Sequence, residues 1–580
     1  MAMYALIRNA MLTLALSGLT ACASGGASPT ADLIITNARV YTVNDTQPWA
    51  QAIAVRDGVI VAVGSTEEVA RLVGANTRAV DVGGRLVMPA FGDAHVHPVF
   101  GGMAYSRCSL HAGESVADYV EIIRGCVAAT PGDGPIYGVG WEDAFFPPNG
   151  VPHKSVLDAI TTDRALVFES VGGHSYWVNS RALQLARVTR ATPDPVNGLI
   201  NRDERTGEPS GGLQETAMGL VASLIPRPTP AEIEASIAYT ARHFNSLGIT
   251  NWHDAGVALS ANGESETFEA YRAALADGVL TSHVSIAWTW ANDRGLEQIP
   301  TIIEAARRAQ SLGIRAVAVK FYVDGVIPQR TAAMIEPYEG SSDDSGSLQI
   351  APDVLSAAVA RLRAAGIQSH VHAIGDRATR VGLDAFEASG ARDVAHFRPM
   401  ISHLNVIDPA DQPRFGATGA IAVFQPTWSS NYPYMDLTKQ AIGPVRSQSI
   451  YPAASVLHGG GMLAYGADWP VATANPLLGL EVAITRTNYE DSASGPLLAN
   501  EGVTLEQAIR AHTLNVAFAT GNEDITGSIE VGKSADIVVL DRDIFAMAPA
   551  DISQARVVTT LFRGASVFGS LDEVDAGAAN

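Results

Sequence analysis

The sequence predicts an α/β fold, a (β/α)₈ TIM-like barrel with a β-sandwich domain formed from both ends of the chain. Between residues 88 and 521, short apolar runs alternate with helical stretches, which is typical of a parallel α/β domain. Nearly every apolar run has a polar or ionisable residue at or near its carboxyl end. In a barrel those ends converge on one mouth, so the repetition favours a barrel over an open, doubly wound sheet.

The two ends of the chain share a different pattern. Residues 32–87 contain short alternating runs with Asp57-Gly58 at a hairpin turn, and residues 522–580 repeat this texture with a turn at Gly564. Isolated hairpins are marginal in water. We therefore expect the two halves to pack together as one β-sandwich.

Composition bounds the class of protein. Of 580 residues, 47% are hydrophobic and 17% are charged, which indicates a globular protein rather than a disordered one. The formal charge of −21, without a long basic run, excludes nucleic acid as a favoured partner. The length predicts one large domain with a smaller companion, and it leaves a homo-oligomer open.

The first residues indicate export. The apolar stretch 11–19 is too short to cross a bilayer, and Leu-Thr-Ala-Cys22 resembles the lipobox of bacterial lipoproteins. We expect a signal peptide at 1–22, lipidation of Cys22, a flexible tether at 23–31, and a protein anchored to a bacterial membrane, facing the periplasm. The alternative is a plain signal peptide with a chance cysteine. Cys108 and Cys126 could form a disulfide or remain two separate thiols.

A pair of histidines opens the predicted barrel. His95 and His97, in the run DAHVHP, point to one face of a strand and could bind one metal ion. Imidazole suits zinc and neighbouring divalent metals. Alone, the pair could also be structural.

Lys320 lies in the apolar run AVAVKFYVDG, where an unpaired ammonium is costly to bury. One interpretation is an ion pair with Asp324. The other is a functional lysine.

Three further ionisable residues follow apolar runs. His372 and His403 could supply a second pair of ligands, or each could be a core histidine. His370 shares a strand face with His372, and we prefer His372 because it is nearer the carboxyl end of the strand. Asp468, in YGADWPV, could bind metal and transfer a proton, or it could cap a turn.

This order of residues resembles the metal-dependent amidohydrolase superfamily over nearly the whole mature chain. More closely, the sequence resembles the branch that contains N-substituted formamide deformylase. The runs that carry this resemblance are GHSYWVNSRAL, GITNWHDAG, VKFYVDGVIPQRTAA, HAIGDRA, YGADWPV and GSIEVGKSADIVVLD.

The resemblance implies the same fold and a site with two divalent metal ions, usually zinc. On that pattern one ion is held by His95, His97 and Asp468, and the second by His372 and His403. Lys320 would be carboxylated by CO₂ and would bridge the two ions, which answers the question of its charge.

The implied activity is hydrolysis of a small molecule at a carbon–nitrogen bond, in an amide or N-formyl group. A metal-held hydroxide would attack the carbonyl, with Asp468 as general acid and base. An insertion at about 141–215 would form a lid. Aromatic residues near these loops, Trp141 and Trp469 among them, favour a bulky apolar substrate, although core packing is an alternative. The residues implied to contact substrate are His174, Asn179, His253, Arg330 and Gln425.

Other functions remain as alternatives. An ester, lactone or carbamate hydrolase could use the same site. A mononuclear deaminase is disfavoured because Gly375 stands where an H-x-x-E motif needs glutamate, and because Lys320 is present. A catalytically inactive surface binding lipoprotein is disfavoured because all six implied ligands are present.

Overall fold

The computed structural model describes residues 30–147, 149–390, 397–572 and 574. The predicted signal peptide, Cys22 and most of the tether lie outside the described residues. Within the described part of the chain, no helix is long and apolar enough to cross a membrane.

Eight parallel strands form the central sheet, in the order β21-β20-β19-β18-β17-β16-β15-β8. A parallel bridge between Val96 and Trp469 joins the two edges and closes the barrel. Gly466 permits this closure, because a Cβ there would lie 2.6 Å from the backbone nitrogen of His95. The predicted barrel is therefore confirmed. Its strands are β8 (Phe91–Val96), β15 (Ile249–Val257), β16 (His283–Thr289), β17 (Arg315–Tyr322), β18 (Gln368–Ala373), β19 (Met400–His403), β20 (Ile421–Phe424) and β21 (Met462–Tyr465).

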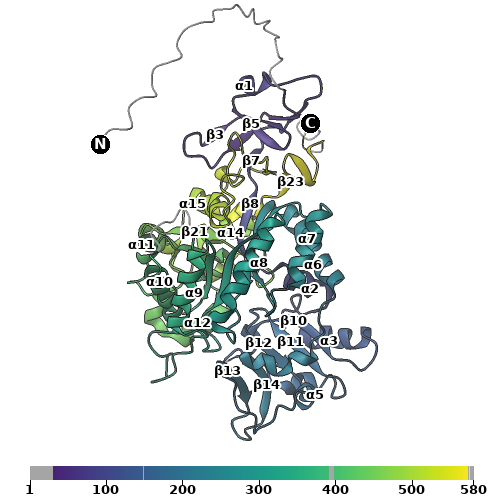
Figure 1. The fold of residues 1–580 in the computed structure, drawn as a ribbon, viewed down its shortest axis with the longest axis vertical. Helices are drawn as coiled ribbons and strands as arrows, with labels where there is room; N and C mark the ends of the chain where they lie inside the picture. Colours follow the sequence, from purple (N-terminus) through teal and green to yellow (C-terminus); the bar gives the residue numbers. More distant parts are fainter. Residues whose placement is uncertain (1–29, 148, 391–396, 573, 575–580) are drawn as a thin grey trace, which may run out of the picture.

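Amphipathic helices cover the barrel (Figure 1). In α6 (Pro230–Ser246), Thr229 and Glu232 form a capping box, and Ile233, Ile237 and Phe244 form the buried stripe. The other longer helices of the barrel region are α2 (Pro98–Ser106), α7 (Glu266–Ala276), α8 (Ile299–Ser311), α9 (Pro352–Ala364), α10 (Asp376–Ala388), α12 (Pro433–Arg446) and α14 (Pro476–Thr485). Shorter ones are α11 (Arg414–Thr418), α13 (Ala453–His458), α15 (Leu505–Ala511) and α16 (Leu514–Ala519).

The two chain ends build two sheets, as predicted. One sheet has the order β24-β23-β22-β7-β2-β3, in which β22 (Ile537–Leu540) pairs antiparallel with β7 (Leu86–Pro89). The second sheet, β5-β4-β1-β6, comes from the N-terminal half alone. The remaining elements are β1 (Leu33–Thr36), β2 (Arg39–Tyr41), β3 (Trp49–Ala50), β4 (Ala52–Arg56), β5 (Val59–Gly64), α1 (Thr66–Ala70), β6 (Arg78–Asp81), β23 (Val557–Phe562) and β24 (Ala565–Phe568).

The two predicted hairpin turns meet in space. Asp57 and Gly58 both have positive φ, as a type I′ turn requires, and so do Arg563 and Gly564. A Cβ on Gly58 would lie 2.8 Å from the carbonyl oxygen of Arg563. Glycine at position 58 thus lets a turn from each end of the chain pack against the other.

The insertion is larger than predicted. Its six-stranded sheet, β13-β14-β12-β11-β10-β9, extends from Cys108 to Glu215, whereas the sequence placed its start at about 141. In Figure 1 it lies below the barrel, and the terminal sheets lie above. Its elements are β9 (Cys108–Ser109), α3 (Val116–Ala129), β10 (Ile136–Trp141), α4 (Lys154–Asp158), β11 (Leu166–Ser170), β12 (Ser175–Val178), α5 (Ser180–Leu185), β13 (Gly198–Arg202) and β14 (Pro209–Glu215).

The insertion has hydrophobic cores of its own. Cys108 on β9 and Cys126 on α3 form a disulfide, with a Cα–Cα distance of 5.9 Å. Trp141 and Trp177 are buried in the core beside them. Of the two roles that the sequence left open for Trp141, core packing is therefore the one that the structure shows, and Trp177 packs in the same core.

Candidate metal centre

The carboxyl ends of the barrel strands bring the predicted ligands together. His95 is near the end of β8, Lys320 lies on β17, and Asp468 follows β21. The Nε2 atom of His95 lies 2.9 Å from Nζ of Lys320 and 3.4 Å from Oδ1 of Asp468. All three side chains are buried.

Three of the six predicted ligands lie close enough together to hold one ion. His95, His403 and Asp468 each offer a ligand atom, and the three atoms lie within 4.8 Å of one another. Oδ1 of Asp468 has no hydrogen-bond partner among the described residues, although it is buried. His403 and Asp468 have φ values of 80° and 57°, a strained conformation that clusters at functional sites.

The other two predicted histidines adjoin this group. Nε2 of His97 lies 3.2 Å from Oδ1 of Asp468, and the ring centroid of His372 lies 4.4 Å from that of His403. Burial lowers the pKa of His95, His372 and His403 well below its usual range, and neighbouring cationic groups lower it further. Neutral imidazoles are the form that binds a metal.

Gln425 orients one of these imidazoles. Its Oε1 atom lies 3.1 Å from Nδ1 of His403 and can accept a hydrogen bond from the N–H there, which leaves Nε2 of His403 free to bind an ion. The predicted substrate contact Gln425 is thus found behind a candidate ligand. Trp428 stacks on the ring of His403, at 5.6 Å between centroids.

Lys320 does not form the ion pair with Asp324 that the sequence left open. The carboxylate of Asp324 accepts hydrogen bonds from three backbone N–H groups, those of Ala333, Ile374 and Gly375. Burial lowers the pKa of Lys320 to about 7, against the opposing effect of nearby carboxylates. Much of this amine is therefore unprotonated at neutral pH.

A second layer of polar side chains lies beneath the ligands. Nε2 of His370 is 3.1 Å from Nδ1 of His95, and Oγ of Ser402 is 3.0 Å from the same nitrogen. His253, which the resemblance implied as a substrate contact, stacks on His370 and bonds to Ser285, so it lies in this buried layer. In the sequence, His370 is marked by the run His-Val-His that it forms with His372. No sequence motif marks Ser402.

The insertion supplies one side chain to the centre. The ring centroid of His174 lies 5.1 Å from that of His372, and its Nδ1 is 3.1 Å from a carboxylate oxygen of Glu215. Burial lowers the pKa of His174, but the carboxylates of Glu215, Asp324 and Asp468 together outweigh burial, and the net pKa is raised. No sequence motif pointed to Glu215.

Two predicted substrate contacts, Asn179 and Arg330, lie outside the candidate metal centre. Asn179 is buried in the insertion, where its side chain accepts from the backbone nitrogens of Leu166 and Ala182 and caps α5. Arg330 pairs with Asp344 at 3.5 Å and lines a cavity beside the cluster. The resemblance named these residues as substrate contacts but could not give their distance from the ligands.

Fold and cluster together define a (β/α)₈-barrel protein with a candidate metal centre at the carboxyl ends of its strands. The amidohydrolase family profile matches residues 78–568, so this chain belongs to the amidohydrolase family and is classed as a hydrolase.

Relatives agree with this assignment. The chain is 28% identical over 553 residues to Protein LONG AFTER FAR-RED 3 of Arabidopsis thaliana, covering 93% of this chain and 92% of that protein. It is 27% identical over 547 residues to N-substituted formamide deformylase of Arthrobacter pascens, covering 92% and 97%. Its fold is similar to that of an uncharacterized metal-dependent hydrolase from Pyrococcus horikoshii, with a TM-score of 0.69 at 21% identity, covering 89% and 99%. The resemblance read from the sequence is confirmed.

Proposed function

We propose that this chain is a metal-dependent hydrolase that cleaves a carbon–nitrogen bond, in an amide or N-formyl group of a small molecule. The observation that carries the proposal is the buried group of His95, His403 and Asp468, whose ligand atoms lie within 4.8 Å of one another. Family membership and the name of the deformylase relative support the choice of bond.

The residues of the cluster fit a divalent metal ion. Imidazole nitrogens with a carboxylate oxygen are the donor set that zinc favours. Oδ1 of Asp468 is buried and makes no hydrogen bond within the described chain, so a bound ion would supply its missing polar contact. A bound divalent ion would lower the pKa of a water molecule and polarise the substrate carbonyl.

In this proposal the ligands are divided between two ions. His95, His97 and Asp468 would hold one ion, and His372 and His403 the other. The three-residue group joins the two sets, because it contains His403 as well as His95 and Asp468. The two ion sites would therefore adjoin.

Lys320 would bridge them as a carbamate. Its neutral, unprotonated amine would attack the carbon of CO₂ and release one proton to solvent, which gives a carbamate anion with two oxygen donors. The position of Nζ, 2.9 Å from His95, and the lowered pKa support this modification.

Asp468 would carry the proton. Its carboxylate would accept a proton from the attacking water and return it to the departing nitrogen. His174, held by Glu215 beside His372, would donate a hydrogen bond to the substrate carbonyl. Gln425 would keep the ring of His403 in its ligand orientation.

The test is metal analysis together with a substrate screen. Purified protein should contain about two zinc ions per chain, and chelation should abolish hydrolysis. The screen compares formamides and amides with esters, lactones and carbamates. Hydrolysis of esters or lactones alone would contradict the carbon–nitrogen assignment, and inactive, metal-free protein that takes up no zinc would support the binding-protein alternative.

We also propose that the protein is exported and anchored through Cys22. The lipobox-like run and the short apolar segment before it support this proposal. Cys22→Ser should move the protein from the membrane fraction to the soluble fraction. Unchanged membrane association would contradict the anchor.

A further inference from the structure

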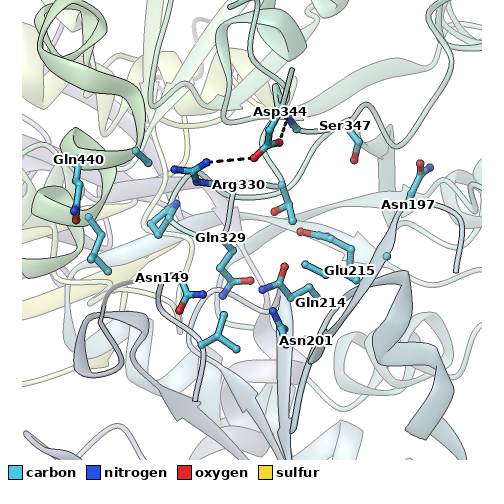
Figure 2. Close-up of a pocket in the computed structure, with 18 residues that line it drawn as sticks. Asn149, Asn197, Asn201, Gln214, Glu215, Gln329, Arg330, Asp344, Ser347 and Gln440 are labelled. Carbon is cyan, nitrogen blue, oxygen red and sulfur yellow. Dashed lines mark hydrogen bonds and ion pairs between the residues drawn. The ribbon is translucent and has the colours of Figure 1, made fainter. Parts of the chain in front are cut away.

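A cavity of about 690 Å³ lies between the insertion and the barrel. Figure 2 shows its walls, which come from β13 and β14, from residues 328–347 after β17, and from α12. None of the six candidate metal ligands lines it. Its volume suits a small organic molecule.

Amide side chains dominate the polar lining of this cavity. Small-molecule pockets are usually apolar, so this lining indicates a ligand recognised through hydrogen bonds. Among the described residues, no aromatic side chain lines the cavity, which disfavours a sugar stacked on a ring. The amide residues are Asn149, Asn197, Asn201, Gln214, Gln329 and Gln440.

Two of the amides are buried and incompletely bonded. Gln214 and Gln329 are 1% and 6% exposed, and Oε1 of each has no hydrogen-bond partner in the part of the chain that the structure describes. Oδ1 of Asn201 is in the same state. In Figure 2 these three amides lie close together on one side of the cavity. A buried polar atom without a partner destabilises the fold, so a ligand that supplies hydrogen bonds to these atoms would be favoured.

The charged side chains of the lining are paired. Arg330 bonds to Asp344 at 3.5 Å, and the carboxylate of Glu215 bonds to His174. A charged ligand would have to break one of these pairs, so the cavity favours a neutral one. A planar amide fits best, because it donates and accepts like the side chains around it.

One residue separates the cavity from the candidate metal centre. On one side, a Cβ at Gly325 would lie 2.1 Å from Oε1 of Glu215, which lines the cavity. On the other side, the carbonyl oxygen of Gly325 lies 3.5 Å from Nε2 of His372. Glu215 and His174 make a second link across the same wall.

We propose that this cavity binds a neutral, amide-bearing group of a small molecule, held by Asn201, Gln214 and Gln329. The group is either the tail of the substrate or a separate molecule that acts on the centre through Glu215 and His174. The first possibility, that the cavity holds the substrate tail, rests on the proposed hydrolysis. The proposal that the cavity binds an amide does not.

Binding is tested by calorimetric titration of the full-length protein with N-acetylglycinamide. Saturable binding is expected, weakened about fivefold or more in Gln214→Leu, since the variant removes hydrogen bonds worth about 1 kcal/mol or more. Leucine is close in shape to this glutamine, so the variant should fold. Gln310→Leu, which changes an exposed glutamine on α8, is the matched control and should bind normally. Absence of saturable binding, or equal affinity in Gln214→Leu, would overturn the proposal.

Kinetics of the zinc-loaded protein distinguish the two sources. If the cavity holds the substrate tail, a formamide with an amide-ended tail should have a higher kcat/KM than one with a hydrocarbon tail of equal length. Gln214→Leu should abolish that preference, and N-acetylglycinamide should inhibit competitively. If the ligand is separate, N-acetylglycinamide should change the kcat of a tailless formamide. Failure to hydrolyse any substrate would count against the proposed function and leave the titration result intact.

Discussion

Each end of the barrel contains a buried carboxylate, and the two carboxylates differ in their hydrogen bonds. At the mouth, Oδ1 of Asp468 has no hydrogen-bond partner within the described residues. At the other end, Asp536 accepts from His283 at 2.7 Å, from Ser534 at 2.6 Å and from the backbone nitrogen of Arg563 at 3.0 Å.

The hydrogen bonds of Asp536 connect two parts of the molecule. His283 begins barrel strand β16, while Ser534 and Arg563 belong to the C-terminal half, so the paired carboxylate joins the terminal sheets to the barrel. Although burial raises the pKa of Asp536, the bond to His283 and the other donors lower it more, and the net pKa is lowered. Oδ1 of Asp468 makes no hydrogen bond within the described residues and lies 3.2 Å from Nε2 of His97 and 3.4 Å from Nε2 of His95, so it is available to a metal ion held beside these imidazoles.

The largest effect is expected at the mouth. Asp468→Asn should lower kcat by about 10²–10⁴-fold, because it removes the group that accepts and returns the proton. An asparagine oxygen can still bind metal, so the metal content measured by mass spectrometry should persist. Asp277→Asn, at an exposed position after α7, is the control. Normal turnover in the Asp468 variant would contradict the proton-transfer role.

The same substitution at the other end should affect folding and not catalysis. Asp536→Asn should lower the free energy of unfolding by about 2–3 kcal/mol, because hydrogen bonds to a charged acceptor are lost in a buried site. Urea unfolding against Asp277→Asn measures this effect. A loss no larger than that of the control would show that the junction does not depend on the charge.

The fold was predictable because its signals are local. Alternation indicated the barrel, and Asp57-Gly58 and Gly564 indicated the hairpins. The start of the insertion was misplaced because β9 and β10 are parallel strands beside a helix, a pattern that barrel segments share.

The sequence predicted the site residues that lie at the carboxyl ends of barrel strands. It did not predict contacts between segments that are far apart in the chain. The period of two along a strand gives the face of His370 and His372, but not their depth in the barrel. The bond between His174 and Glu215 depends on how the insertion folds back on itself beside the barrel, which no motif encodes. The cavity amides come from separate segments for the same reason.

The contribution of Asp536 should depend on pH. A carboxyl group with a lowered pKa in the folded state stabilises fully above its unfolded pKa, about 3.9, and loses that contribution as the pH falls through the folded value. The stability difference between the wild type and Asp536→Asn should therefore be largest near pH 7 and shrink below about pH 4. Urea unfolding at several pH values measures it. A difference that grows on acidification would contradict the sign of the shift.

The smallest effect should be the stability of Asp468→Asn in chelated, metal-free protein. Because Oδ1 of Asp468 has no hydrogen bond to lose within the described chain, neutralising it should change the free energy of unfolding by less than about 1 kcal/mol, or raise it. Adding zinc should then stabilise the wild type, because a ligand that binds only the folded state adds its binding free energy. A loss as large as that of Asp536→Asn in metal-free protein would show that the mouth carboxylate is a structural partner. The contrast between the two ends of the barrel would then fail.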